Sequence, residues 1–213
     1  MQKFIVVPDL SKTFLFRMIH IENISHVWEF GITKIDSVNS NTNYKSIGDG
    51  SLINNRSNFL MPNGKTLGNY IPFYFWYRMP MLYVIQKGFN GVTPSLPQDI
   101  VYCITNVFNL IENEIDYVFT DGHAVDSFSS FYLSKDILKI EEKLDFNAIK
   151  DNFWKDDNDL DKKRRKEAEF LVANNIPQSA IHVFAVFNQT AKDKLIQLGI
   201  PNEKITIKSE FYF

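Results

Sequence analysis

The chain has 213 residues and a formal net charge of −2 at pH 7, with 45% hydrophobic and 23% charged residues. These values are ordinary for a globular protein with a substantial core, and we expect a single domain over residues 1–213. The near-neutral charge argues against electrostatic binding of duplex DNA over a whole basic face. Because no apolar run approaches the length of a membrane span, we expect no membrane contact and a cytoplasmic location.

The aromatic content is high, with nineteen phenylalanines and nine tyrosines. Most of these side chains must lie in the core, but an excess also suits stacking on a flat ligand such as nicotinamide or an unpaired base. The single cysteine, Cys103, lies in the apolar run IVYCIT. We expect it in a buried strand with an unreactive thiol, and one cysteine allows no disulfide within the chain.

The first half of the chain is predicted to combine short strands with short helices. Strands are expected at 4–7, 14–20 and 69–76, and helices at 23–30 and 79–87, ending at Gly31 and Gly88. The stretch 37–65 is rich in Asn, Ser and Gly and shows little periodicity. It is therefore predicted to be a long loop, and Arg56 is its only arginine.

The second half shows the same mixture of elements. Strands are expected at 100–105, 117–120, 182–187 and 205–208, and helices at 107–113, 145–150 and 190–198. Residues 121–123, Asp-Gly-His, form a tight turn after the strand at 117–120. Short strands among short helices, without a regular βαβ repeat, are typical of an α+β fold.

The segment Lys162–Val172, KKRRKEAEFLV, follows four aspartates and is predicted to be a helix. Helical spacing would place Arg165 and Glu169 on one face, where an ordinary surface ion pair is one interpretation. The alternative is that Glu169, followed at once by three apolar residues, is partly buried and has a functional role. The segment alone leaves both interpretations open.

Known nucleotide-binding, hydrolase and metalloprotease motifs are missing from the sequence: it has no Walker loop, GxGxxG, GxSxG or HExxH. Its four histidines are isolated from one another, so no metal site is expected. The remaining polar residues of interest also have structural interpretations. Asn23 is more often a helix N-cap than a ligand contact, His20 can cap the same helix, and Tyr74 can be core.

Six motifs taken together are more informative than any one of them. In chain order they are His20-Ile21-Glu22-Asn23, Arg56, Tyr70–Phe75 (YIPFYF), Met79–Leu82 (MPML), Val118–Ala124 (VFTDGHA) and Ala168–Val172 (AEFLV). This order resembles DarT, the toxin family of a DNA-targeting toxin–antitoxin system. The resemblance runs from about residue 14 to residue 212.

The resemblance implies an ADP-ribosyltransferase fold with split central β-sheets flanked by short helices. It also implies a pentosyltransferase reaction, in which ADP-ribose passes from NAD to a base in single-stranded DNA and nicotinamide is released. Thymidine is the favoured base and guanosine the alternative. The implied partners are NAD, single-stranded DNA and a macrodomain antitoxin similar to DarG, with no metal.

The resemblance also assigns roles to particular residues. Glu169 and Arg56 match the catalytic glutamate and the loop arginine that acts on the target base. The remaining assignments are His20, Asn23, Tyr74 and Arg17 for NAD, and His123, Arg78, Lys163 and Arg165 for DNA. The region 121–169 would recognise the DNA.

Elementary chemistry agrees with these assignments. Cleavage of the nicotinamide–ribose bond develops positive charge on the ribose, which a nearby carboxylate such as Glu169 stabilises. Arg56 could assist the base electrostatically; whether it also takes the proton stays open, because a free guanidinium is protonated. Two alternatives remain open from the residues: a non-catalytic single-stranded nucleic-acid binding protein, and a transferase acting on protein or RNA.

Overall fold

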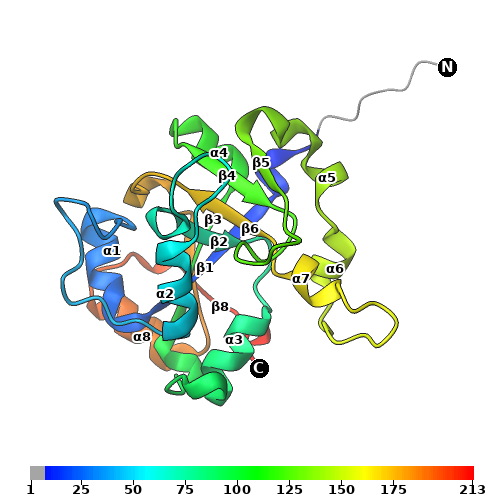
Figure 1. The fold of residues 1–213 in the computed structure, drawn as a ribbon. Coiled ribbons are helices and arrows are strands. Elements are labelled where there is room, and N and C mark those ends of the chain that lie inside the picture. Colours follow the sequence, from blue (N-terminus) through cyan, green and yellow to red (C-terminus); the bar gives the residue numbers. More distant parts are fainter. Residues whose placement is uncertain (1–7) are drawn as a thin grey trace.

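The computed structural model describes residues 8–213, so the strand predicted at 4–7 lies outside the described part. Eight strands form one sheet in the order β5-β4-β6-β2-β1-β3-β7-β8 (Figure 1). The strands are β1 (Phe14–His20), β2 (Ile71–Tyr74), β3 (Ile100–Asn106), β4 (Tyr117–Thr120), β5 (Phe131–Leu133), β6 (Glu169–Val172), β7 (Val183–Val186) and β8 (Ile205–Ile207). The helices are α1 (Ile24–Phe30), α2 (Gly50–Asn58), α3 (Pro80–Lys87), α4 (Val107–Glu112), α5 (Ile140–Lys143), α6 (Phe146–Lys150), α7 (Lys162–Lys166) and α8 (Gln189–Gln197).

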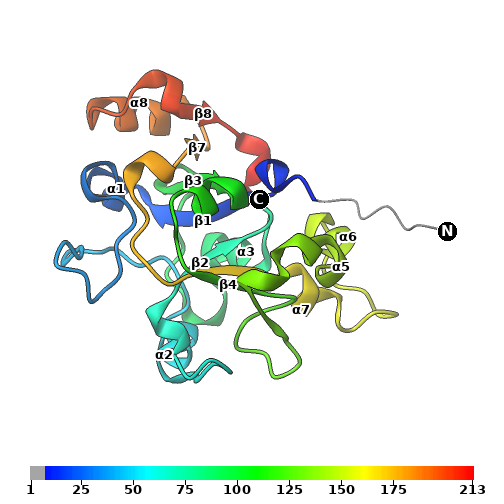
Figure 2. The ribbon, with the colours of Figure 1, turned by 90° about the horizontal axis from the view of Figure 1, so that it is seen from above.

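The sheet is nearly divided in the middle. β1 pairs with β3 along its whole length, from Phe14 to His20, but meets β2 at a single pair, Phe16 opposite Tyr74. Two four-stranded halves therefore meet at a narrow junction, in agreement with the predicted split of the central sheet. The two halves separate in Figure 2, where β8 and α8 lie at one end of the molecule and α2 at the other.

The two faces of the sheet carry different clusters, because side chains alternate along each strand. The largest core cluster lies on one face, where α1, α4, α5, α6 and α8 all contribute side chains. The opposite face carries two smaller clusters, one formed with α3 and the segment 211–213, the other with residues 59–70. Tyr74 and Glu169 belong to this second face, in register with each other on β2 and β6.

Most of the predicted elements are confirmed, including the α+β class and the helix ends at Gly31 and Gly88. The predicted loop at 37–65 was wrong in part, because it contains α2. Asp49 begins that helix by accepting hydrogen bonds from the backbone N–H groups of Ser51 and Leu52. An Asp N-cap satisfies donors that a short polar helix cannot pair internally.

The prediction of one helix over 162–172 was also wrong. α7 ends at Lys166, the chain turns at Glu167, and Glu169 is the first residue of β6. β6 lies between β2 and β4, and all four of its residues are buried. The apolar run Phe170–Val172 is stabilised more by a central place in the sheet than by another helical turn, so tertiary packing overrides the helical spacing.

Candidate active site

Glu169 is fully buried, and both of its carboxylate oxygens have partners within the protein. Oε1 accepts a hydrogen bond from the backbone N–H of Ala124 at 2.9 Å. Oε2 accepts one from Nη1 of Arg56 at 2.8 Å. A buried charge needs partners of this kind. The interpretation of Glu169 as one half of a surface pair with Arg165 is therefore wrong.

Thr120, at the end of β4, joins Glu169 to the turn that follows β4. Its hydroxyl accepts a hydrogen bond from the backbone N–H of Glu169 at 3.1 Å and donates one to the carbonyl of Gly122 at 2.7 Å. Thr120 thus holds the backbone of Glu169, and the Ala124 N–H holds its carboxylate. Sequence reasoning assigned neither a role, although both lie in the VFTDGHA motif.

Arg56 reaches Glu169 from α2, a helix that buries none of its own side chains. The helix is held at Gly68, where a Cβ atom would lie 2.8 Å from the Cα of Ser57. The Arg56 side chain is 14% exposed, and its Nη2 is buried without a hydrogen-bond partner among the described residues. One nitrogen of the guanidinium binds Glu169, which leaves the other available to a ligand.

Tyr74 lies opposite Glu169 in the β2–β6 ladder. Burial raises the pKa of its phenol, and the charges of Glu169 and Glu167 raise it further. The phenol therefore stays protonated at neutral pH and keeps its O–H as a donor.

His20 lies on the same face as Phe16 and Tyr74, at the far end of β1. Its Nδ1 accepts a hydrogen bond from the backbone N–H of Glu22 at 3.2 Å, in agreement with the predicted cap. In this tautomer Nε2 carries the hydrogen. Burial lowers the pKa of His20, which favours the neutral ring at pH 7.

Asn23 is buried and makes no side-chain hydrogen bond that caps α1. Instead its side-chain amide binds the backbone of Lys45. Nδ2 donates to the Lys45 carbonyl and Oδ1 accepts from the Lys45 N–H, both at 2.8 Å. The N-cap interpretation is therefore wrong. Asn23 therefore fixes the backbone of the segment before α2.

Arg17 does not join this group of residues. It follows Phe16 on β1 and pairs with Cys103, so its side chain leaves the strand on the opposite face from Tyr74. Its Nη1 donates to the Pro72 carbonyl at 2.9 Å, across the junction between the two half-sheets. This hydrogen bond gives Arg17 a structural role at the junction, and its contact with NAD stays a prediction.

The basic run at 162–166 is mostly neutralised. Arg165 forms ion pairs with Asp145, Asp159 and Asp161. Its Nε lies 2.9 Å from Oδ2 of Asp145. Lys166 is fully buried and donates to the carbonyls of Ile149 and Asp151. The prediction that Arg165 meets DNA phosphates is therefore not supported by the geometry.

Lys163 differs from the rest of the run. It is exposed and forms no ion pair within residues 8–213. With His123 it lines a cavity of about 440 Å³ beside the turn that holds Glu169. Arg78, another residue predicted to contact DNA, lies elsewhere with its guanidinium 4.6 Å from the centre of the Phe213 ring.

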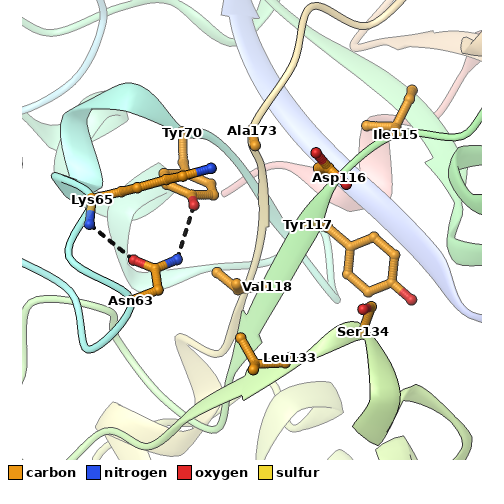
Figure 3. Close-up of a pocket in the computed structure, with 10 residues that line it drawn as sticks. All are labelled: Asn63, Lys65, Tyr70, Ile115, Asp116, Tyr117, Val118, Leu133, Ser134 and Ala173. Atoms are coloured by element: carbon orange, nitrogen blue, oxygen red, sulfur yellow. Dashed lines mark hydrogen bonds between the residues drawn. The ribbon is translucent and has the colours of Figure 1, made fainter.

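A second cavity, of about 270 Å³, lies at the other end of β4 and β6 (Figure 3). Tyr117 and Ala173 line it, whereas Thr120 and Glu169 mark the opposite ends of the same strands. Asn63 donates a hydrogen bond to the Tyr70 hydroxyl at 3.1 Å in its wall. This cavity is therefore separated from the Arg56–Glu169 pair by the length of the strands.

Other kinds of site find little support within residues 8–213. Cys103 is buried, and burial raises the pKa of its thiol to about 12, so it is no nucleophile at neutral pH. Those residues contain no group of three or more His, Cys, Asp or Glu side chains placed to hold a metal ion. None of the helices described there is long and apolar enough to cross a bilayer.

A family model described as "ssDNA thymidine ADP-ribosyltransferase, DarT" matches residues 16–213. The chain belongs to the DarT family. It is thus a DNA ADP-ribosyltransferase, with NAD as the donor substrate, and the predicted resemblance is confirmed.

The relatives agree with this assignment. A DNA ADP-ribosyl transferase from Escherichia coli O127:H6 is 29% identical over 190 residues, which cover 88% of this chain and 86% of the relative. One from Thermus sp. strain 2.9 is 29% identical over 164 residues, 75% of this chain and 76% of the relative. In fold, the chain is similar to Thermus sp. 2.9 DarT in complex with ADP-ribosylated ssDNA, with a TM-score of 0.82, 24% identity and coverage of 98% and 99%.

Proposed function

We propose that this DarT chain is a toxin that transfers ADP-ribose from NAD to a thymine ring nitrogen in single-stranded DNA and releases nicotinamide. The observation that carries the assignment of residues is the buried pair of Arg56 and Glu169. A buried carboxylate held by a protonated arginine, beside a protonated phenol, suits charge stabilisation rather than covalent attack. Single-stranded DNA is required because base pairing hides the reactive edge of the ring.

Glu169 acts on the sugar in this proposal. As the nicotinamide–ribose bond breaks, positive charge develops at the anomeric carbon and the ring oxygen. The Glu169 carboxylate stabilises that charge through a hydrogen bond to a ribose hydroxyl. Its fixed position between the Ala124 N–H and Arg56 means that little reorganisation is needed during the reaction.

Arg56 acts on the base. The buried Nη2 of its guanidinium is available to an exocyclic oxygen of thymine, while Nη1 stays with Glu169. This contact would stabilise the negative charge that grows on the ring when its N3–H is lost. Guanine also offers an exocyclic oxygen, so we rank guanosine second on the residues alone and thymidine first from the family description.

The donor would lie along the face of β1 that carries Phe16 and His20, with nicotinamide near Tyr74. His20 offers its Nε2–H, and Asn23 holds the loop that borders the same surface. DNA would approach from the turn 121–126 and Lys163. We do not include Arg17, Arg78 or Arg165 among the residues that contact substrate.

The proposal includes an antitoxin that removes the modification. A relative from Thermosipho africanus, 28% identical over 196 residues, is named a DNA ADP-ribosyl transferase–DNA ADP-ribosyl glycohydrolase fusion protein, and the present chain spans 47% of it. We propose that a macrodomain protein similar to DarG has the same relation to this chain. We place both in the cytoplasm, where DNA and NAD are available.

The test is incubation of the purified protein with labelled NAD and single-stranded oligonucleotides, each containing one kind of base, followed by mass spectrometry. We expect a thymidine oligonucleotide heavier by one ADP-ribose unit and free nicotinamide. Glu169→Gln, which keeps the shape of the side chain, should lower the rate by at least about 10³-fold, since a carboxylate no longer faces the ribose. Binding of DNA without an adduct in the folded wild type would favour a non-catalytic binding protein instead.

A further inference from the structure

Arg164 takes no direct part in the proposed reaction, yet its side chain joins α7 to the connection between β4 and β5. The side chain is only 13% exposed. Its Nε and Nη2 donate to the two carboxylate oxygens of Asp161 at 2.6 and 2.9 Å, in the bidentate arrangement that arginine favours. Its Nη1 donates to Oδ1 of Asp121 at 3.0 Å and to the Ser129 hydroxyl at 3.3 Å. Arg164 therefore ties α7 to both ends of that connection, residues 121–130.

The connection is also closed by hydrogen bonds of its own. Oδ1 of Asp121 accepts a hydrogen bond from the backbone N–H of Ser130 at 2.9 Å. Oδ2 of Asp121 accepts one from the Tyr132 hydroxyl at 3.3 Å. Arg164 thus binds a carboxylate that is itself fixed, and linked hydrogen bonds of this kind restrain every member of the network.

The guanidinium of Arg164 is packed closely against the backbone of the connection. A Cβ atom at Gly122 would overlap Nη1 of Arg164, and it would lie 2.8 Å from both Cγ of Arg164 and Oγ of Ser129. The absence of a side chain at Gly122 lets the guanidinium approach this far. The contact therefore differs from an exposed ion pair, in which both partners move freely and solvent screens the charges.

The connection carries one of the two groups that bind the Glu169 carboxylate. The Ala124 N–H donates to Oε1 of Glu169 at 2.9 Å. This N–H and the carbonyl of His123 belong to one planar peptide group. That carbonyl accepts hydrogen bonds from the Ser129 hydroxyl at 2.8 Å and from the Asp126 N–H at 2.9 Å. Holding the carbonyl therefore fixes the direction of the N–H that binds Glu169.

Arg164 reaches this peptide group by two routes. Its Nη1 bonds the same Ser129 hydroxyl that donates to the His123 carbonyl. Its own backbone carbonyl accepts a hydrogen bond from the His123 N–H at 3.1 Å. A continuous path of hydrogen bonds therefore runs from the guanidinium through Ser129 and the peptide group to the Glu169 carboxylate.

We propose that Arg164 is a positioning residue of the ADP-ribosyl transfer, and that it acts by aiming the Ala124 N–H at the Glu169 carboxylate before substrate binds. Donors that are already oriented need no reorganisation when charge develops on the ribose. Without the guanidinium, the Ser129 hydroxyl loses a partner and Asp121 loses its cation. A displacement of about 1 Å at a catalytic group costs on the order of 10²-fold in rate, so the loss of Arg164 lowers kcat without removing a substrate contact.

Arg165 provides a matched control at the next position of the chain. It is an arginine of the same helix, and it forms ion pairs with three aspartates. Within the described part of the chain, its side chain has no hydrogen bond to the connection 121–130. Replacing either arginine by methionine therefore removes several ion pairs, but only Arg164→Met interrupts the path to Glu169.

This inference rests on the proposed function, because Glu169 is its target, and the first measurement compares rates of transfer. Wild type, Arg164→Met and Arg165→Met are assayed with NAD and a thymidine oligonucleotide, at a temperature where circular dichroism shows all three folded. We expect Arg164→Met to lower kcat by about 10- to 100-fold, with KM for NAD within about threefold of wild type. Arg165→Met should keep kcat within about threefold. Equal losses in both variants, or a native kcat in Arg164→Met, would overturn the proposal.

Ser129→Ala interrupts the same path and leaves the ion pairs of Arg164 in place. It should lower kcat by about 3- to 10-fold, the value of one hydrogen bond, without a change in KM for NAD. This variant carries the test if Arg164→Met does not fold. A native kcat in Ser129→Ala would also overturn the proposal.

The second measurement observes the Ala124 N–H itself and needs neither NAD nor DNA. In protein made with isotope-labelled alanine, the NMR signal of the Ala124 amide is assigned by its loss in Ala124→Gly. Hydrogen exchange at this amide should be at least about tenfold faster in Arg164→Met than in wild type, whereas Arg165→Met should change it by less than about threefold. An unchanged exchange rate in Arg164→Met would contradict the proposal. A wild type that leaves DNA unmodified would count against the proposed function instead, and the exchange rates would still test Arg164.

Discussion

Arg56 and Glu169 are 113 residues apart in the sequence and 2.8 Å apart in the structure. One comes from a polar surface helix and the other from a central strand, so their contact fastens α2 to the sheet. The pair therefore has a structural effect besides the catalytic role proposed for it. Removing either partner leaves a buried group without its charge partner, which is costly.

A double-mutant cycle with Arg56→Met and Glu169→Gln measures the strength of this pair. We expect Arg56→Met to lower the free energy of unfolding by about 3–5 kcal/mol, because it leaves the Glu169 carboxylate buried without its cation. Adding Glu169→Gln should restore part of this loss, with a coupling of at least about 1 kcal/mol. Urea unfolding provides the values, and strictly additive changes would mean that the pair is not formed in solution.

Much of the fold could be predicted from the sequence, because strands such as β3 and helices such as α3 carry their own local signals. Glu169 shows the limit of such prediction. The spacing of Arg165 and Glu169 fits a helix, but the chain leaves the helix at Glu167 because β2 and β4 provide partners for Phe170–Val172. No local sequence pattern can identify β2 as the partner of β6, because β2 lies about a hundred residues earlier in the chain.

The candidate site was predicted by the resemblance rather than by local chemistry. Glu169, Arg56 and Tyr74 lie together as that resemblance implied, since the order of motifs carries long-range information. A basic run looks free in a sequence, whereas three aspartates bind Arg165 in the structure.

Thr120→Val tests the hydrogen bonds by which the Thr120 hydroxyl positions the backbone of Glu169. Valine has nearly the same shape but cannot bond to the Glu169 N–H or the Gly122 carbonyl. Leaving these buried groups unpaired should cost about 1–3 kcal/mol and lower kcat, because the carboxylate is less well fixed. Thr120→Ser keeps the hydroxyl and should retain more of the activity; a serine variant as slow as the valine variant would exclude the hydrogen bonds as the cause.

Gly122→Ala tests the packing of the turn against α7. A Cβ atom at this position would overlap the Arg164 side chain, whose guanidinium bonds Asp121 at 3.0 Å. We expect a loss of about 1–3 kcal/mol in stability and a higher KM for DNA, because the cavity lined by His123 and Lys163 changes shape. Gly50→Ala is the matched control, since a Cβ there meets nothing within 4 Å. Equal effects of the two substitutions on KM would contradict this explanation.

The buried amine of Lys166 should make the stability of the protein depend on pH in a specific way. Burial lowers the pKa of its amine to about 8 from the ordinary lysine value of 10.5. Between these values the unfolded chain binds the proton and the folded chain does not, so the free energy of unfolding contributed by this group rises with pH. The increase is at most about 3 kcal/mol. Lys166→Met should remove the rise from pH 8 to pH 10 in urea unfolding; a wild-type minus variant difference that is flat over this range would show that the amine is not desolvated in solution.

Lys163 and Arg165 lie two residues apart but should affect DNA binding differently. Lys163 is exposed and has no ion pair in the described part of the chain, so it is available to a phosphate. Lys163→Ala should weaken binding of single-stranded DNA and reduce the salt dependence by about 0.7 in the slope of log K against log salt. Arg165→Ala should leave that slope unchanged and instead lower stability, because three aspartates lose their partner. Binding measured by fluorescence anisotropy from low to physiological salt separates the two, and a slope change in Arg165→Ala alone would reverse the assignment.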